Sequence, residues 1–438
     1  MRNWRKTLAS LALLTLSLSL LSACTLTRSK NQVIPLVIPL VIPLEPTQAA
    51  RPPDLAFGPL TRIAFDGTEN TGFGEAVDIS GDTLVVGATD WNVGPGDQFG
   101  SVYVYQRTGS EWNQQARLTS SDGQDGFQYD QHYGRSVAIE GDTIVVGAPD
   151  ADHPEGGDNA GAVYVFKRSG ETWEESAKLE AAEPRAHERF GNKLYLDGNT
   201  LAVAGDQDDA LYVFVWDGEA WVQQARLKFS LPPENHWRTV SLALYGDILA
   251  AGVTNTPFFA QEGSGSVFVY QRQGNKWTES DRLEGERDFG VAVALGASPA
   301  AQDGQADTLA VGAGGDSTAG LYAGAVYIYG RQGGEWSEQT ILTSPDAIMD
   351  QPFPTNHAFF GSSVALQGDL LLVLSRFSAA VFIYQGQGAS WTDQLEVATQ
   401  YGFGEFEIWP IAIDGSTVVW GTPGEFGNSA HVFDISLR

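Results

Sequence analysis

The clearest pattern along the chain is a short stretch in which aliphatic and aromatic residues alternate, as in Val102-Tyr103-Val104-Tyr105. Successive side chains of a strand point to opposite faces, so this alternation makes both faces apolar and predicts a strand sandwiched between neighbouring sheets. The stretch recurs at residues 163–166, 211–214, 267–270, 326–329, 381–384 and, in a degenerate form, 430–433. Seven copies of one unit indicate a repeat architecture.

Other features keep a fixed place around this strand. It is preceded by a Phe-Gly step, a short apolar strand, a Gly-Asp turn and a second apolar strand that ends in Gly-Ala. It is followed by Gly-x-x-Trp and a final strand that ends in Leu, so each unit contains four strands. The glycine suits a tight hairpin, and the regular placement of the tryptophans predicts packing between units rather than a ligand platform. The six pairs are Gly109/Trp112, Gly170/Trp173, Gly218/Trp221, Gly274/Trp277, Gly333/Trp336 and Gly388/Trp391.

Four-stranded units spaced by roughly 45 to 70 residues are typical of propeller blades. The last unit stops after its third strand, whereas Pro59-Leu60-Thr61-Arg62-Ile63, ahead of the first unit, looks like a fourth strand without a blade. Closing the ring with this segment would remove exposed sheet edges. The predicted fold is therefore all-β: a seven-bladed β-propeller of four-stranded antiparallel blades over residues 55–438, closed by an N-terminal strand that completes the last blade.

The units resemble the FG-GAP repeats of bacterial extracellular proteins, which are related to the N-terminal propeller of integrin α subunits. The residues that carry the resemblance are Phe73-Gly74, Phe190-Gly191, Phe289-Gly290 and Phe360-Gly361 for the first half, and Gly87-Ala88, Gly147-Ala148-Pro149 and Gly312-Ala313 for the second. Integrin-like repeats usually carry an Asp-rich calcium loop between the first two strands. Here that loop is reduced to Gly81-Asp82, Gly141-Asp142, Gly246-Asp247 and Gly368-Asp369. One carboxylate in each turn falls short of the 6–8 oxygen ligands that calcium takes, so these turns are expected to be structural.

The N-terminus predicts an anchor. Residues 1–23 combine a basic start with an apolar run from Leu11 to Leu21, and they end in Leu21-Ser22-Ala23 before Cys24. This arrangement resembles a lipoprotein signal peptide cleaved before Cys24, which would then be lipidated; the alternative is an ordinary signal peptide with a chance cysteine. Residues 24–54 are expected to form the lipid anchor and a Pro-rich tether, because Val-Ile-Pro-Leu occurs three times in residues 33–44.

A tether of this kind is expected to be extended, since proline every fourth residue prevents helix formation; the alternative is that its apolar side chains lie along the lipid surface. The expected location is thus a membrane-anchored lipoprotein that faces the periplasm or the cell exterior, on the outer membrane or cell surface.

Composition then narrows the function. The formal net charge of −28 argues against nucleic acid as a partner. Cys24 is the single cysteine, so a cysteine nucleophile and an intramolecular disulfide are excluded. No Gly-x-Ser-x-Gly or His-Glu-x-x-His motif is present. We therefore expect a monomeric propeller with no catalytic residue and no required cofactor.

One end of the blades carries most of the variation in length. The loops between second and third strands and the crossings between blades vary at residues 89–99, 122–132, 150–160, 253–264, 314–323 and 343–359, whereas the other turns are short and uniform apart from an insertion around residues 303–307. Because binding residues concentrate on variable loops of a rigid scaffold, this end is the expected binding face.

The candidate binding residues on that face are aromatic or polar. The aromatics are Trp91, Phe99, Tyr129, Phe258, Phe259 and Tyr322, with Phe353 and Phe359 in the same loops; the alternative is that they cap blade ends. The polar candidates are His132, Asp150, Asp152, His153, Glu155, Asp158 and His357. Asp150, Asp152 and Asp158 are also candidate ligands for a calcium ion, against the alternative of a solvated acidic loop.

These observations favour a surface-tethered, non-catalytic module that binds an extracellular or envelope protein or a glycan. Two alternatives stay open. One is a structural or assembly factor of the cell envelope. The other is a polysaccharide-active enzyme, a hydrolase or lyase with a carboxylate-based site.

Overall fold

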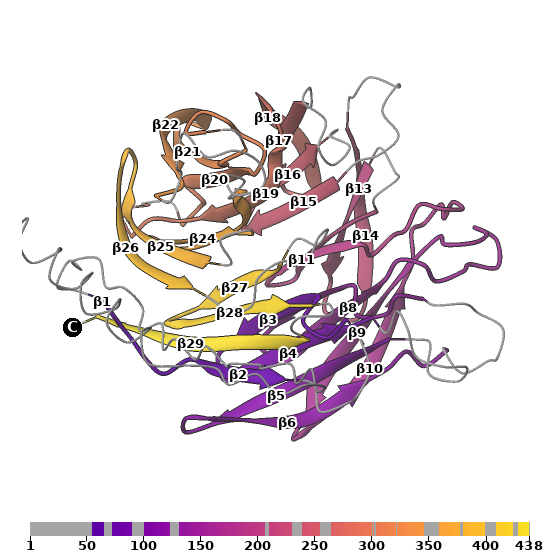
Figure 1. Ribbon diagram of the computed structural model, residues 1–438. Coiled ribbons are helices and arrows are strands. Elements are labelled where there is room, and N and C mark those ends of the chain that lie inside the picture. The colour runs from indigo at the N-terminus through magenta and orange to yellow at the C-terminus, as the bar shows by residue number, and fades with distance from the viewer. Residues whose placement is uncertain are drawn as a thin grey trace, which may run out of the picture. The chain divides into compact units, whose positions relative to one another are not determined.

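The computed structural model describes residues 55–64, 72–89, 100–122, 131–205, 210–229, 239–254, 264–299, 301, 304–320, 322–345, 359–376, 380–398, 409–423 and 428–437. Within these ranges the chain forms strands and turns but no helix, and accordingly none that could cross a membrane. The strands form seven antiparallel sheets, which are the blades of a propeller (Figure 1). The predicted seven-bladed fold is thus confirmed.

Blades 1 to 6 each pair four consecutive strands in chain order, from the innermost to the outermost. Blade 1 comprises β3 (Ala76–Ser80), β4 (Thr83–Ala88), β5 (Ser101–Thr108) and β6 (Glu111–Leu118). Blade 2 comprises β7 (Ser136–Glu140), β8 (Thr143–Ala148), β9 (Ala162–Ser169) and β10 (Thr172–Leu179). Blade 3 comprises β11 (Lys193–Asp197), β12 (Thr200–Ala204), β13 (Ala210–Trp216) and β14 (Trp221–Lys228).

The next three blades repeat this order with longer outer strands. Blade 4 comprises β15 (Thr239–Tyr245), β16 (Ile248–Thr254), β17 (Ser264–Gln273) and β18 (Lys276–Glu286). Blade 5 comprises β19 (Phe289–Gly296), β20 (Thr308–Ala313), β21 (Ala325–Gln332) and β22 (Glu335–Thr343). Blade 6 comprises β23 (Phe360–Gln367), β24 (Leu370–Ser375), β25 (Ala380–Gln387) and β26 (Ser390–Ala398).

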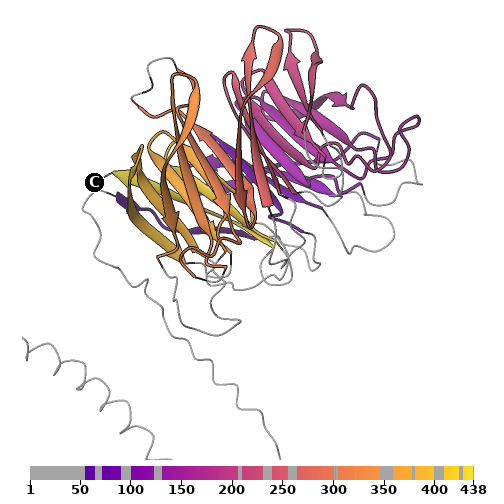
Figure 2. The same ribbon diagram turned by 90° about the horizontal axis from the view of Figure 1, so that it is seen from above.

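Blade 7 joins the two ends of the described chain. Its inner strands are β27 (Ile411–Asp414), β28 (Thr417–Thr422) and β29 (Ser429–Leu437), and its outer edge is formed by β1 (Leu55–Phe57) and β2 (Thr61–Ala64). Ile63 pairs with Ala430 and Phe57 with Ile435, so the N-terminal segment occupies the place of a fourth strand. Figure 2 shows the C-terminal strand beside the N-terminal one. The predicted closure by an N-terminal strand is confirmed.

The alternating strands are buried on both sides, as their pattern predicts. Val102 and Val104 of β5 belong to the apolar cluster between blades 1 and 2, whereas Tyr103 and Tyr105 belong to the cluster between blades 7 and 1. Every third strand therefore contributes one face to each of two joints. The core is divided into seven such clusters, one at each joint between blades.

The Phe-Gly and Gly-Ala halves of the repeat meet across these joints. The glycine that ends the second strand of one blade lies against the Phe-Gly carbonyl of the next blade: a methyl group on Gly147 would overlap the carbonyl oxygen of Gly191. The same contact joins Gly87 to Gly134 and Gly421 to Gly74, the latter between blades 7 and 1. Two backbones approach this closely only when neither residue has a side chain.

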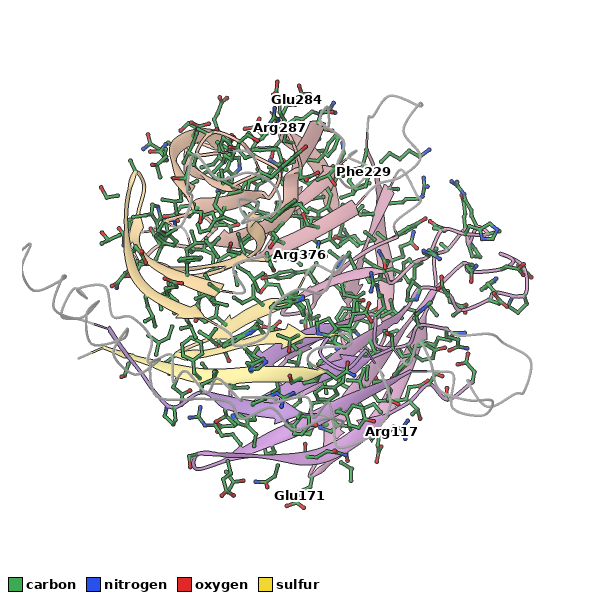
Figure 3. The ribbon with its side chains drawn as sticks, in the orientation of Figure 1. Arg117, Glu171, Phe229, Glu284, Arg287 and Arg376 are labelled. Atoms are coloured by element: carbon green, nitrogen blue, oxygen red, sulfur yellow. The ribbon has the colours of Figure 1, made fainter. Side chains whose placement is uncertain are left out.

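The tryptophans that begin the outer strands pack inward, as the sequence predicts. Trp173, Trp221, Trp277 and Trp336 are each less than 10% exposed. Trp173 Nε1 donates a hydrogen bond to Gln115 of the preceding blade at 3.0 Å. The guanidinium of Arg168 lies over the indole of Trp173, 4.5 Å from the centre of the indole ring. At the other end of the outer strands, the guanidinium of Arg117, a residue labelled in Figure 3, lies 5.8 Å from the ring centre of Tyr103. These contacts use the tryptophans for packing and leave them unsuited to bind a ligand.

Candidate functional site

The two ends of the blades differ in backbone conformation. We call the end that bears the second-to-third-strand loops and the crossings between blades the loop face, and the end that bears the other turns the turn face. Among the described residues, nine non-glycine residues have positive φ, and all nine lie on the loop face. They are His132, Asn159, His187, Arg189, Arg287, Asp288, Tyr322, Phe359 and Asn428. Such conformations cost about 1–3 kcal/mol each and persist only where surrounding contacts fix them.

Asp150 is the centre of a polar cluster on the loop face of blade 2. It follows β8 directly, is 9% exposed, and contacts a residue from each neighbouring crossing. One carboxylate oxygen contacts His132 Nδ1, and the other forms an ion pair with Arg189, 2.9 Å from its Nε. His132 precedes Tyr133-Gly134 and Arg189 precedes Phe190-Gly191, so both occupy the same place in successive repeats. The carboxylate thereby holds two blade crossings to one loop.

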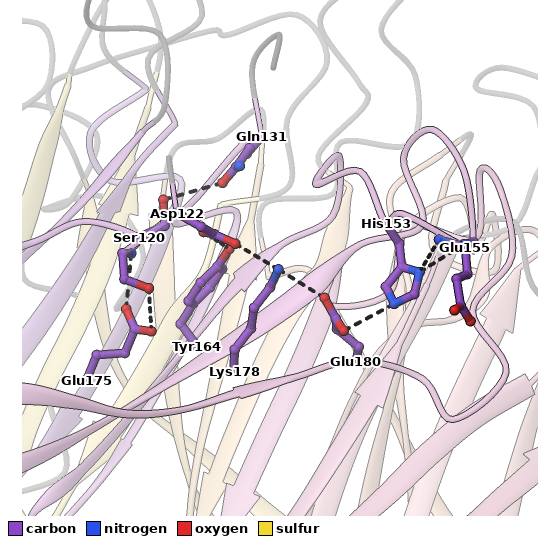
Figure 4. Close-up of polar contacts among 11 residues, drawn as sticks. Ser120, Asp122, Gln131, His153, Glu155, Tyr164, Glu175, Lys178 and Glu180 are labelled. Atoms are coloured by element: carbon purple, nitrogen blue, oxygen red, sulfur yellow. Dashed lines mark hydrogen bonds and ion pairs between the residues drawn. The ribbon is translucent and has the colours of Figure 1, made fainter. Parts of the chain in front are cut away.

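A second set of polar contacts runs outward from this cluster along the rim of blade 2 (Figure 4). Asp122, from the crossing into blade 2, accepts from Tyr164 Oη at 2.6 Å and from Lys178 Nζ at 2.8 Å. Lys178 Nζ also lies 2.9 Å from one carboxylate oxygen of Glu180, and His153 Nε2 lies 3.2 Å from the other. Figure 4 shows these side chains in one row between the outer strands and the 150–160 loop.

The tautomer of His153 follows from its contacts. Its Nδ1 accepts from the backbone N–H groups of Glu155 at 3.1 Å and Gly156 at 2.8 Å. Nδ1 therefore acts as the acceptor, and Nε2 is the nitrogen that faces Glu180. The imidazole holds the turn of the 150–160 loop from inside and connects it to the sheet.

Charge in this row is balanced locally. Burial alone would raise the pKa of Asp122, but hydrogen bonds from Lys178 and Tyr164 lower it below its usual range. The pKa of Lys178 is raised: its partial burial opposes this, and the contacts with Asp122 and Glu180 outweigh it. Burial and the bond to Asp122 both raise the pKa of Tyr164, so its hydroxyl stays protonated and acts as a donor only.

Sequence reasoning found part of this site. It named His132, Asp150, Asp152, His153, Glu155 and Asp158, and the structure brings His132 to Asp150. It missed Arg189, Asp122, Lys178 and Glu180. Arg189 had a signal, because it precedes Phe-Gly just as His132 precedes Tyr-Gly; the other three lie on different strands and crossings and had none.

The calcium site is not supported by the geometry. Asp150 is occupied by His132 and Arg189, and Asp152 accepts from the backbone N–H of Asn159 at 2.9 Å. Within the part of the chain that the structure describes, no three His, Cys, Asp or Glu side chains are grouped so as to hold a metal ion. Asp150 and Asp152 thus contact groups of the protein itself.

Several predicted residues lie outside the described ranges. They are Cys24, Trp91, Phe99, Tyr129, Phe258, Phe259, Phe353 and His357. Of the predicted aromatics, Tyr322 and Phe359 are described; both are partly exposed on the loop face, where their rings lie parallel with centres 6.0 Å apart. The structure therefore brings together two aromatics from separate loops.

A cavity of about 550 Å³ runs between the first strands of all seven blades. Four side chains that precede a turn glycine connect neighbouring blades near its turn-face end. Gly81 N–H donates to Asp414 at 2.5 Å, Gly141 N–H to Ser80 at 3.1 Å, and Gly246 N–H to Asp197 at 2.5 Å, while Gly198 N–H donates to Glu140. Each of these acceptors therefore forms a hydrogen bond between two neighbouring blades and stabilises the ring.

Burial of carboxylates in this cavity raises their pKa values. Burial raises the pKa of Asp78 to about 7, with smaller contributions from Asp414 and Glu140, although the N–H groups of Ile139 and Ile79 oppose it. Burial likewise raises the pKa of Glu140, with Asp197 and Asp414 adding to the effect. Asp78 is therefore about half protonated near neutral pH.

Comparison with known proteins supports the fold and the repeat. The FG-GAP repeat family matches residues 63–105 and 112–166. None of the curated proteins compared with the chain is significantly similar to it. Among solved structures, the WD40 domain of Toxoplasma gondii coronin shares 10% identity, with a TM-score of 0.50 over 87% of this chain and 88% of that one.

The polysaccharide lyase Uly1 also shares 10% identity, with a TM-score of 0.50 over 85% of this chain and 91% of the lyase. Likeness at this identity reflects a shared propeller fold and says nothing of chemistry. The repeat match covers the first two blades, and together with the seven closed blades it fits an integrin α-like propeller built from FG-GAP repeats. A propeller of this kind supports a binding or structural role.

Proposed function

We propose that the chain is a surface-tethered, non-catalytic module that recognises an extracellular protein or glycan through its loop face. The observation that carries the proposal is the confinement of positive φ in non-glycine residues to that face, among the residues described. On the turn face the corresponding positions are glycines such as Gly141 and Gly170, which adopt positive φ without strain. Strain retained on one face alone supports the proposal that this face is under functional constraint.

The polar groups of that face suit recognition better than acid–base catalysis. Asp150 is buried and held by His132 and Arg189, and Asp152 accepts a backbone N–H. Tyr164, the hydroxyl in the row on blade 2, is fully buried. A catalytic acid or base must reach the proton that it transfers, and these groups are directed at the protein's own backbone and side chains.

Site-specific photo-crosslinking tests the binding proposal. A photoreactive residue at Glu155, which is exposed on the loop face, is compared with one at Ser390, exposed on the turn face. The full-length chain is kept in its native envelope, and adducts are identified by mass spectrometry. A specific adduct from position 155 alone supports the proposal. Equal labelling from both positions, or labelling from position 390 alone, contradicts it.

The tether is a separate part of the proposal. We infer that Cys24 is lipidated after removal of residues 1–23 and that residues 24–54 hold the propeller away from the membrane. Replacement Cys24→Ser should move the protein from the membrane fraction to the soluble fraction. A variant that sediments with membranes as completely as the wild type would refute the lipid anchor while leaving the loop-face proposal intact.

A further inference from the structure

The loop face of blades 5 and 6 carries a preformed aromatic pair. Tyr322 lies in the loop between β20 and β21, and Phe359 lies in the crossing that leads into β23. Their rings are parallel within 3°, with centres 6.0 Å apart, and both residues are partly exposed. The Phe359 N–H donates to the Tyr322 carbonyl at 3.2 Å, so the two loops are also joined through their backbones.

The loop beneath this pair is fixed by its own hydrogen bonds. Tyr322 N–H donates to Ser317 Oγ at 3.1 Å, and the same hydroxyl accepts from Arg287, which follows β18 directly (Figure 3). Buried Asp316 accepts from Thr318 N–H at 2.7 Å and from the Tyr327 hydroxyl at 2.8 Å. A surface fixed before binding loses little conformational entropy when a ligand arrives.

Blade 2 shows that the fold does not require aromatic residues at these two places. Arg189 N–H donates to the Asn159 carbonyl at 3.0 Å, just as Phe359 N–H donates to Tyr322, so Asn159 corresponds to Tyr322 and Arg189 to Phe359. In blade 1 the residue that corresponds to Phe359 is Gly72. All of these residues have positive φ, which asparagine and glycine adopt more readily than aromatic residues do.

We propose that Tyr322 and Phe359 form the stacking platform of a binding site for a neutral glycan, an inference that rests on the proposed function and names its ligand class. The face of an aromatic ring carries partial negative charge and attracts the polarised C–H groups of a pyranose. The hydroxyl groups of the sugar would bind Arg287, Asp288 and Thr318, which lie around the same loop. Asp288 directly precedes β19, and its carboxylate lies beside Gly315 in the loop between β20 and β21.

The charges of the site and of the whole protein favour a neutral glycan over a charged one. The site offers one cation and one anion, Arg287 and Asp288, and the protein carries a formal net charge of −28. A polyanionic glycan would be repelled by that field. A pyranose with equatorial hydroxyls presents an apolar face without charge to an aromatic ring.

Isothermal titration calorimetry with cellohexaose and mannohexaose tests the inference on the full-length chain, solubilised in a detergent without a sugar headgroup. The informative variants are Tyr322→Asn and Phe359→Gly, which copy the residues of blades 2 and 1 and relax the backbone. Each should weaken binding at least tenfold while the thermal midpoint stays the same or rises. The matched control Asn159→Gly, at the corresponding place in blade 2, should bind like the wild type.

Three outcomes would overturn the inference: no binding of either hexasaccharide by the wild type, full binding by both aromatic variants, or tighter binding of oligogalacturonate than of the neutral sugars. Its failure is distinguishable from failure of the proposed function. A protein adduct from position 155 together with no glycan binding leaves the loop face as a protein-binding surface. Binding lost in the control variant and retained in the aromatic variants moves the glycan site to blade 2.

Discussion

Five of the seven joints between blades carry the same pair of glycines, and two do not. We name each joint by its two blades, so that joint 7/1 lies between blades 7 and 1. At the joints 7/1, 1/2, 2/3, 4/5 and 5/6 a glycine of the second strand lies against the glycine of the Phe-Gly step in the next blade. At joint 3/4 the second strand has Ala204 in place of this glycine, because Ala204 pairs with Leu211 just as Gly147 pairs with Val163. At joint 6/7 the second strand has Leu374 there, which pairs with Val381. The FG-GAP signature is therefore a property of a joint between two blades and not of a single blade.

The two exceptional joints are packed by side chains instead. Ala204 belongs to an apolar cluster with Phe229 and Val240 between blades 3 and 4, and Leu374 to one with Trp409 and Trp420 between blades 6 and 7. Joint 3/4 also keeps the bond from Gly246 N–H to Asp197 at its turn-face end. The exceptions divide the ring into two runs of glycine joints, and the polar cluster on blade 2 and the aromatic pair on blade 5 lie in different runs.

The largest effect is expected from a methyl group placed into a glycine joint. In Gly147→Ala the new Cβ would overlap the carbonyl oxygen of Gly191, and a strand backbone in a closed ring has little room to move. We expect a loss of at least about 3 kcal/mol in the free energy of unfolding, measured by urea denaturation followed by tryptophan fluorescence. A loss below about 1 kcal/mol would show that the glycine contact is incidental.

Acid should loosen blade 7, next to the exceptional joint 6/7. Burial lowers the pKa of His431 to about 4, and the ring stacks on Trp420 with centres 5.0 Å apart. The unfolded chain binds a proton at this histidine below its ordinary pKa of about 6.5, so stability is lost as pH falls from 6.5 to 4, by up to about 3 kcal/mol.

His431→Phe, which restores the aromatic residue of the other third strands, should remove this contribution. The raised pKa of Asp78 acts in the opposite direction, since the folded state takes up that proton between pH 7 and 4. The difference between variant and wild type isolates the histidine. Parallel pH profiles for the two proteins would contradict the assignment.

A smaller effect is expected at joint 1/2, where the Phe-Gly step is Tyr133-Gly134. The Tyr133 ring is fully buried and its hydroxyl has no hydrogen-bond partner among the residues that the structure describes, whereas Phe190 fills the same place at joint 2/3. Tyr133→Phe should therefore raise stability by about 1–2 kcal/mol, because an unsatisfied buried hydroxyl is removed. The reverse change Phe190→Tyr is the control and should destabilise; a destabilised Tyr133→Phe would mean that the hydroxyl has a role.

The smallest effect separates the two classes of joint. In Ala204→Gly the exceptional joint acquires the glycine of the others, but no Phe-Gly step precedes blade 4 to meet it. We expect a loss of about 1 kcal/mol, from the missing methyl group and the added freedom of the unfolded chain. Thermal melting measures it, and a stabilised variant would refute the view that joint 3/4 is packed by its side chains.

Much of the fold could be predicted from the sequence because its signals are local. The alternation of Val163-Tyr164-Val165-Phe166 already requires a strand buried on two sides, and the unpaired segment at Thr61 already indicates how the ring closes. What could not be predicted depends on contacts across blades. No pattern along the chain shows that Gly147 lies against Gly191, or that Asp150 forms an ion pair with Arg189. Both contacts follow from how one blade is placed against the next.

The candidate site, like the fold, was predicted only where its signals are local. Its face and the acidic loop at Asp150–Asp158 followed from variation in loop length. The row from Asp122 to Lys178 depends on side chains of separate strands meeting at a rim, and the stacking of Tyr322 on Phe359 depends on two loops whose spacing in the sequence carries no information.

Hydrogen–deuterium exchange of the intact chain tests the division of the joints most directly. The first strand of each blade is bonded to one neighbouring strand only and otherwise depends on its joint. The account predicts that the amides of β15 and β27, at joints 3/4 and 6/7, exchange before those of β3, β7, β11, β19 and β23. Uniform exchange of the seven first strands, or earliest exchange at a joint sealed by two glycines, would contradict it.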